Sequence, residues 1–252
     1  MRMDHVRKLL TMFALGCIVL STSLHAITIT ASDDTWVRED NPNSNRDSDG
    51  LLNARTDLDG DDNDVILLRF STSVLSTPVV DSRLTLFWQR SDGNASNALS
   101  LYGLNESHVD ETIWSESLVT YNDAPGLLPD GQNPSIEFGL AHAFDDVRDL
   151  DLANLTPLVL GQPYGPQILN DAYSFASSAL TDFINADTNN EVTFLIVRAN
   201  ESGNGNQARF WASESGLAPV LTINAVPEPG TVLLIALAGI GLIAGRRQAG
   251  DH

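Results

Sequence analysis

The chain has 252 residues with 14 basic and 33 acidic side chains, and its formal net charge at pH 7 is −19. Between residues 27 and 226 the imbalance is larger, because nine arginines, no lysine and 30 acidic residues give a net charge of −21. A surface of this charge repels nucleic acid and anionic lipid, and it argues against unaided binding of an acidic polysaccharide. The same range holds no cysteine and only two histidines, His108 and His142, which excludes thiol, Schiff-base and histidine-rich metal chemistry.

The first 26 residues have the pattern of a secretory signal peptide. A basic start is followed by an apolar run over residues 9–20 and by a small, polar stretch that ends at Ala26. We therefore predict export across the inner membrane and cleavage after Ala26. The only cysteine, Cys17, lies inside the apolar run, and a lipoprotein signal at this cysteine is the minor alternative.

The body of the chain, residues 27–225, alternates short apolar runs with clusters of Asp, Asn, Gly, Ser and Pro, which is typical of an all-β protein. Within one such run Leu84, Leu86 and Trp88 share a face, which predicts a half-buried strand. We expect a single antiparallel β-sandwich domain with strands near residues 27–31, 35–38, 51–54, 65–70, 82–89, 99–104, 155–160, 192–198, 209–212 and 220–224.

Two elements of the body stand out from this alternation. Val192–Val197 is apolar on both faces and predicts a central strand that is covered on both sides. Residues 173–186 predict one short helix, capped by Asp171 or Ser174. Its apolar stripe comprises Phe175, Ala179, Phe183 and Ile184.

Residues 226–252 form the third predicted region. An uncharged apolar run of 14 residues, 231–244, lies between a proline-rich motif and an arginine pair: Pro227, Glu228, Pro229, Arg246 and Arg247. As a helix this run spans only ~21 Å, against ~30 Å for the hydrocarbon core of a bilayer. The order of these features resembles the PEP-CTERM sorting signal of Gram-negative bacteria. The resemblance implies a transient transmembrane helix, processing by an exosortase-type enzyme and release to the cell surface; a plain tail anchor is the alternative.

A second resemblance covers nearly the whole body of the chain. Its motifs are Asp33–Arg38 with Asn41–Asn45, Leu67–Phe70, Trp114–Glu116 with Val119–Pro125, and Phe210–Glu214 with Ala218–Leu221. These segments resemble the DNRLRE, or disaggregatase-related, domain. The resemblance implies a jelly-roll β-sandwich of the kind grouped with carbohydrate-binding modules, which occurs on polysaccharide-degrading enzymes and on cell-surface proteins.

The densest polar cluster lies directly before the strand predicted at 65–70. Asp57, Asp59 and Asp61 alternate in a loop and can direct carboxylates at one centre, and Ca²⁺ takes about six to eight such oxygens. The spacing is not that of an EF-hand, because Asp62 occupies the place of the glycine. A calcium site and a solvated acidic hairpin loop are both open interpretations. The same two interpretations apply to a second acidic stretch with Asp33, Asp34, Asp40, Asp47 and Asp49.

Sugar binding would use exposed aromatic planes, because pyranose faces stack on Trp and Tyr while polar side chains bond the hydroxyls. For each candidate, core packing is the alternative role. The candidates are Trp36, Trp88, Trp114, Tyr121 and Trp211. For catalysis the sequence nominates no residue, because it has no G-x-S-x-G, H-E-x-x-H or P-loop motif and nothing selects a carboxylate pair among the acids.

We therefore predict an exported, surface-destined protein that serves as a non-catalytic binding or structural module of the extracellular matrix. The predicted partners are an exosortase-type sorting enzyme, the inner membrane in transit, and an extracellular polysaccharide. Calcium is the one cofactor that the sequence suggests. The alternatives are a polysaccharide-degrading lyase or hydrolase and a calcium-bridged matrix protein without a sugar ligand.

Overall fold

The computed structural model describes residues 25–56, 63–75, 78–91, 97–108, 110–128, 150–165, 168–199 and 207–225. Residues Ala26–Asn224 form one compact unit. Within the described ranges, no helix is both long and apolar enough to cross a membrane. The predicted signal peptide as far as residue 24, the sorting motif and the predicted helix at 231–244 lie outside these ranges.

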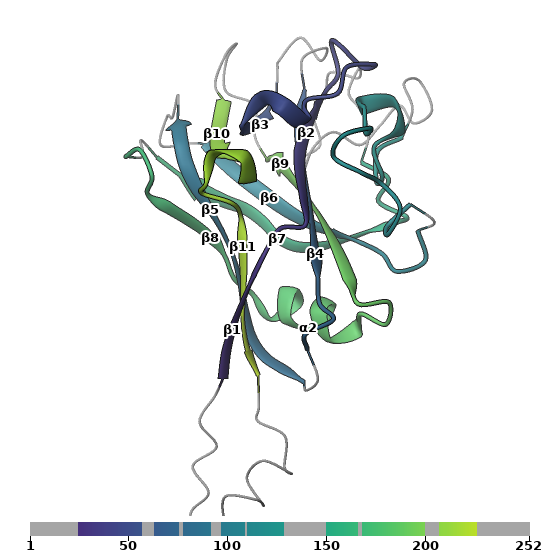
Figure 1. Ribbon diagram of the computed structural model, residues 1–252, viewed down its shortest axis with the longest axis vertical. Helices are drawn as coiled ribbons and strands as arrows, with labels where there is room; N and C mark the ends of the chain where they lie inside the picture. Colours follow the sequence, from purple (N-terminus) through teal and green to yellow (C-terminus); the bar gives the residue numbers. More distant parts are fainter. Residues whose placement is uncertain are drawn as a thin grey trace, which may run out of the picture. The chain divides into compact units, whose positions relative to one another are not determined.

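Among the described residues, eleven strands form one curled antiparallel sheet, and one α-helix lies beside it (Figure 1). The strand order is β1-β11-β5-β10-β3-β4-β9-β6-β7, with β2 paired to β4 and β8 paired to β5. The all-β prediction is confirmed, and each of the ten predicted runs overlaps a strand, with the runs 27–31 and 209–212 extending one residue past β1 and β10. The strands are β1 (His25–Thr30), β2 (Asp33–Arg38), β3 (Leu51–Arg55), β4 (Asp64–Ser71), β5 (Val79–Ser91), β6 (Asn97–Leu104), β7 (Leu155–Tyr164), β8 (Ala172–Phe175), β9 (Glu191–Arg198), β10 (Gln207–Trp211) and β11 (Val220–Ala225).

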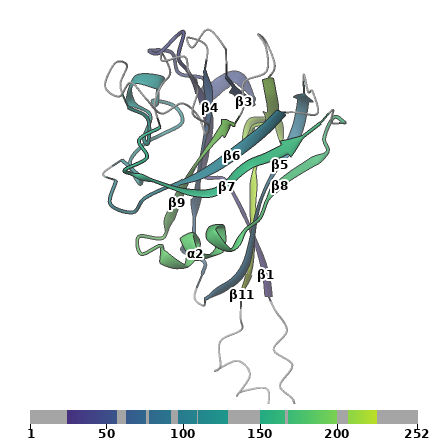
Figure 2. The same cartoon turned by 180° about the vertical axis from the view of Figure 1, so that it is seen from behind.

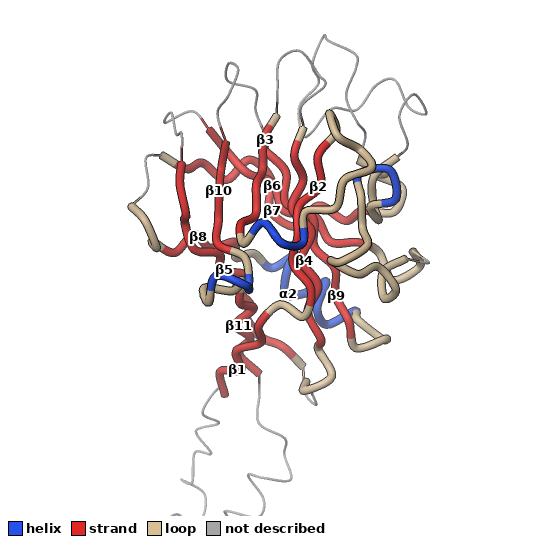
Figure 3. The backbone as a smooth tube through the Cα atoms, turned by 45° about the horizontal axis from the view of Figure 1, so that its top comes forward, coloured by secondary structure: helices blue, strands red, loops and turns tan. Residues whose placement is uncertain are grey.

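The main core lies inside the curl, where strands from the two halves of the sheet face each other as in a β-sandwich (Figure 3). Leu84, Leu86 and Trp88 of β5 are fully buried there, as their shared face predicts. The Trp88 ring packs against Phe210 of β10 with ring centroids 4.2 Å apart. Burial of each such large side chain contributes roughly 1.5–3 kcal/mol, so this cluster is the main source of stability.

A second core lies on the other face of β4, β9 and β6. Residues of the segment 110–128, here called the covering segment, pack on this face, and Trp114 donates its indole N–H to Thr193 Oγ1 of β9 at 3.0 Å. Strand β9 pairs with β4 on one side and β6 on the other. Its residue Phe194 belongs to the main core and its neighbour Leu195 to the second core. The prediction of a central strand covered on both faces is thus confirmed, and the second core is its physical reason.

The prediction of a helix starting at Tyr173 was wrong at its N-terminal end. Tyr173 and Phe175 lie in β8, which pairs with β5, and the helix α2 spans only Ser178–Ala186. The buried side chains of β8 alternate with more exposed ones, which is the period of a strand. Phe175 also lies four residues before Ala179, which is a helical spacing. Its position therefore matched the predicted apolar stripe of the helix although it belongs to a strand.

The helix begins after Ser177 rather than after Asp171 or Ser174. Ser177 has extended backbone angles, and its Oγ accepts the backbone N–H of Leu180 at 3.0 Å. The buried face of α2 packs against β5 and β7 (Figure 2). The helix therefore covers one part of the main core, as an amphipathic element of this length should.

Candidate functional site

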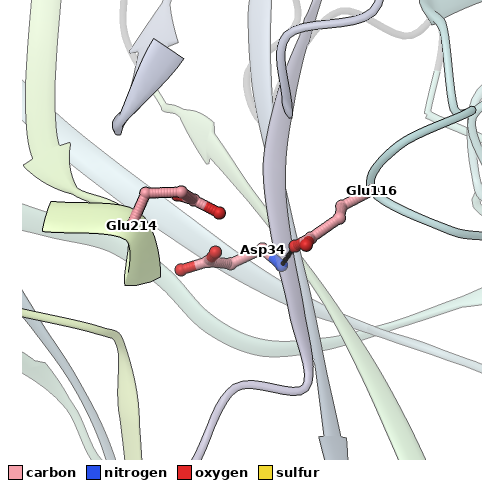
Figure 4. A group of neighbouring side chains, drawn as sticks. All are labelled: Asp34, Glu116 and Glu214. Atoms are coloured by element: carbon pink, nitrogen blue, oxygen red, sulfur yellow. Dashed lines mark hydrogen bonds between the residues drawn. The ribbon is translucent and has the colours of Figure 1, made fainter. Parts of the chain in front are cut away.

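Three carboxylates from distant parts of the sequence meet beside β2 (Figure 4). Asp34 lies on β2, Glu116 in the covering segment, and Glu214 in the 3-10 turn Ser213–Ser215 that follows β10. One carboxylate oxygen from each residue lies within 4.8 Å of the others. Asp34 is only 1% exposed, whereas Glu116 is half-buried and Glu214 is exposed.

Hydrogen bonds hold the buried member of this cluster. Asp34 Oδ2 accepts the backbone N–H of Ser213 at 3.0 Å, and Asp34 Oδ1 accepts the Ser213 hydroxyl at 2.7 Å. Glu116 Oε2 in turn accepts the backbone N–H of Asp34 at 2.8 Å. The cluster therefore ties together β2, the covering segment and the turn after β10.

The surroundings of the cluster raise the pKa of two of its carboxyl groups, Asp34 and Glu116. Burial raises the pKa of Asp34 from 3.8 to about 6; the Ser213 hydrogen bonds oppose this shift, and the charges of Glu214 and Glu116 add to it. Burial likewise raises the pKa of Glu116. The guanidinium of Arg69 forms ion pairs with Asp33 and Glu191 instead.

As a metal centre the cluster offers oxygen donors of the kind that Ca²⁺ and Mg²⁺ prefer. It supplies three carboxylates, fewer than the roughly six to eight oxygens of a calcium site, and both oxygens of Asp34 already accept hydrogen bonds. We assign no ion to it. The calcium candidates named from the sequence, Asp57, Asp59 and Asp61, lie outside the described residues.

Sequence reasoning found part of this cluster. Asp34 belongs to the second acidic stretch named from the sequence. Glu116 and Glu214 lie in segments that resemble the DNRLRE domain, and the sequence predicts no role for either. They are 82 and 180 positions away from Asp34 along the chain, so only the three-dimensional pairing of the strands could bring the three together.

The structure separates the five aromatic candidates sharply. Trp88 is fully buried, and Trp36, Trp114 and Tyr121 are at most 6% exposed, so these four serve as core. Trp211 differs, because it is partly exposed at the end of β10. Its indole N–H donates to Asn170 Oδ1 at 2.8 Å.

Comparison with family models adds to this geometry. Residues 25–133 match the model of carbohydrate-binding module family 96. This family 96 match spans β1 to β6 and the covering segment, and it includes Asp34 and Glu116 but not Trp211. The predicted likeness to carbohydrate-binding modules is confirmed, whereas the DNRLRE name stays a prediction.

Residues 225–248 match the PEP-CTERM protein-sorting motif, so the predicted sorting signal is confirmed. This match contains Pro227, Glu228, Pro229 and both arginines, Arg246 and Arg247. It indicates export and sorting to the cell surface or extracellular space, and the family 96 match indicates carbohydrate binding. A search of curated proteins finds no significant match.

Two histidines lie in the described part of the chain, His25 at the exposed start of β1 and His108. His108 is half-buried, and its Nδ1 accepts the backbone N–H of Asp110 at 3.2 Å. This local bond uses one ring nitrogen inside a turn. His142 lies outside the described residues.

Proposed function

We propose that this protein is a non-catalytic module that binds an extracellular polysaccharide after export and exosortase-dependent sorting. The observation that carries the proposal is the match of residues 25–133 to a carbohydrate-binding module family, over the part of the chain that contains β1 to β6. The sorting motif supports a site of action outside the cell. In this proposal the segment 231–244 holds the chain in the inner membrane only until the motif is processed.

A polysaccharide-degrading enzyme is the second candidate, because one carboxylate oxygen each of Asp34, Glu116 and Glu214 lies within 4.8 Å of the others, and retaining glycosidases place two carboxyl groups about 5–5.5 Å apart. Two features of the cluster argue against it. Asp34 is almost fully buried, and its two oxygens are engaged by Ser213. A carboxyl group so enclosed cannot approach a glycosidic bond, so the cluster suits a structural role better than a catalytic one.

The two functions predict different results with the same reagents. The full chain, purified in a mild detergent, is run through native gels that contain xylan, β-glucan, galactomannan, alginate or xanthan, and the same polysaccharides are assayed for new reducing or unsaturated ends. A binding module is retarded in at least one gel and releases no ends. Release of ends that disappears in the Asp34→Asn variant would establish the enzyme instead, and an absence of retardation in all gels would overturn the binding proposal.

A further inference from the structure

Partly exposed aromatic side chains are rare in the described part of the chain. Three of them occur there, Phe87, Phe183 and Trp211. Phe183 packs against the main core from α2. Phe87 and Trp211 belong to neither core, so neither hydrophobic cluster accounts for them.

The strand register places Phe87 and Trp211 beside each other. Strands β5 and β10 are antiparallel, and Trp88 pairs with Phe210, both of which point into the main core. The register ends at this pair, so Phe87 and Trp211 are the next residues of the two antiparallel strands, and both point away from that core because side chains alternate along a strand. Phe87 is also paired with Ala172 of β8. The open face of these strands thus carries an apolar row.

The ring of Trp211 is fixed in place by the neighbouring turn. Its indole N–H is bound to Asn170, whose own backbone N–H donates to the carbonyl of Trp88 at 2.7 Å. Asn170 has a φ of 70°, a left-handed conformation that asparagine tolerates better than most residues. Two exposed aliphatic residues of the same turn, Ile168 and Leu169, are 73% and 57% exposed. The Trp211 ring is therefore hydrogen-bonded to a turn that carries exposed aliphatic side chains.

Polar side chains flank the apolar row on both sides. Thr85, two residues before Phe87 and so on the same face, shares a hydrogen bond of 2.8 Å with Ser174 of β8. On the other side Arg209 of β10 is paired with Arg90 of β5. A register shift between Arg209 and Phe210 places both arginines on the face that points away from the main core. Thr85 is buried, so the half-buried Ser174 hydroxyl and the guanidinium groups are the ones that can bond to sugar hydroxyls, while aromatic faces take the C–H groups of a pyranose ring.

We propose that Phe87, Trp211, Ile168 and Leu169, here called the Trp211 platform, form the surface on which the pyranose rings of the polysaccharide stack. This inference rests on the proposed function and adds the site to it. The rigid ring lowers the entropic cost of binding, because Trp211 is already oriented in the free protein. The chain of sugar units lies across β5 and β10, with its hydroxyls directed to the polar edges.

The test uses the full chain and the polysaccharide that retards it in the native gel. Trp211→Ala should raise the dissociation constant by about tenfold or more, as expected for loss of a central aromatic anchor, and Trp211→Phe should raise it less. Leu118→Ala is the matched control, because Leu118 is 74% exposed and lies in the covering segment, which packs on a different part of the sheet. Its dissociation constant should equal that of the wild type.

Tryptophan fluorescence tests the site without depending on the stability of the alanine variant. The chain has four tryptophans, and three of them are at most 6% exposed. The polysaccharide should therefore protect Trp211 from acrylamide quenching in the wild type, and Trp211→Phe should abolish that protection.

The possible outcomes distinguish the platform from the function. Retardation of the wild type with equal retardation of Trp211→Ala, or a fluorescence change that survives in Trp211→Phe, would overturn the platform and leave the proposed function standing. Equal weakening in Leu118→Ala would also overturn the platform. A wild-type chain that no polysaccharide retards would overturn both.

Discussion

Replacement of the buried Asp34 by asparagine should change how the stability of the protein depends on pH. The folded pKa of Asp34 is raised to about 6, above the value of 3.8 for an exposed group. A protonated Asp34 therefore contributes stability that is fully present below about pH 4 and is lost as the pH rises through the folded pKa of about 6. Asparagine has no charge to desolvate, so Asp34→Asn removes this part of the pH dependence.

The magnitude follows from the shift. A change from 3.8 to about 6 corresponds to roughly 3 kcal/mol of unfolding free energy, at about 1.36 kcal/mol per pKa unit. The wild type has other groups of this kind, since burial also raises the pKa of Glu111 to about 7. The informative quantity is therefore the difference between variant and wild type at each pH, which isolates Asp34.

Urea unfolding of both proteins at pH 4 and pH 8 measures this difference. Relative to the wild type, Asp34→Asn should gain roughly 3 kcal/mol more at pH 8 than at pH 4. Asp182→Asn is the control, because Asp182 is exposed on α2 and should follow the wild type at both pH values. If Asp34→Asn also ran parallel to the wild type, Asp34 would have no raised pKa and the account of the cluster would be wrong.

Three further predictions test the helix, the core and the tail. Ser177→Ala should lower the unfolding free energy by about 0.5–2 kcal/mol through loss of the helix cap, whereas Ser178→Ala at the next, exposed position should not. Gly103→Ala should cost about 1–3 kcal/mol, because a Cβ atom there would stand 2.5 Å from the Phe183 ring, and Phe183→Leu in the same chain should recover part of the loss in urea unfolding. Alanines at 227–229 should leave the protein in the inner membrane fraction, and unchanged release into the medium would contradict the sorting function.

The strands were predictable because their signal is local. A strand that buries one face must alternate, and Leu84, Leu86 and Trp88 did so over enough residues to be recognised. Strand β8 has only four residues and runs almost directly into α2, so Tyr173 and Phe175 satisfied both periods. Only the apolar pattern of β9 indicated the second core from the sequence. The covering segment has little regular structure, so its sequence shows no periodicity that would reveal its packing.

The site depended on information that a single sequence does not contain. Trp36 and Trp211 both lie on strands, but one is 6% exposed and the other partly exposed. Trp36 points into the main core whereas Trp211 points away from it, and which face of a strand becomes the core depends on strand order. In the same way, Asp34 and Glu214 meet only because β2 and the end of β10 lie close together in the folded sheet.

The end of the last strand lies far from the Trp211 platform along β5. Asn224, near the end of β11, lies beside the first residues of β5, since its Nδ2 donates to Asp81 Oδ2 at 3.3 Å. Phe87 stands six residues further along β5, which is about 20 Å at roughly 3.3 Å per residue. The chain thus leaves the body toward the sorting motif at one end of β5, and the Trp211 platform lies near the other end. Polysaccharide bound at the platform therefore leaves the end of β11 uncovered.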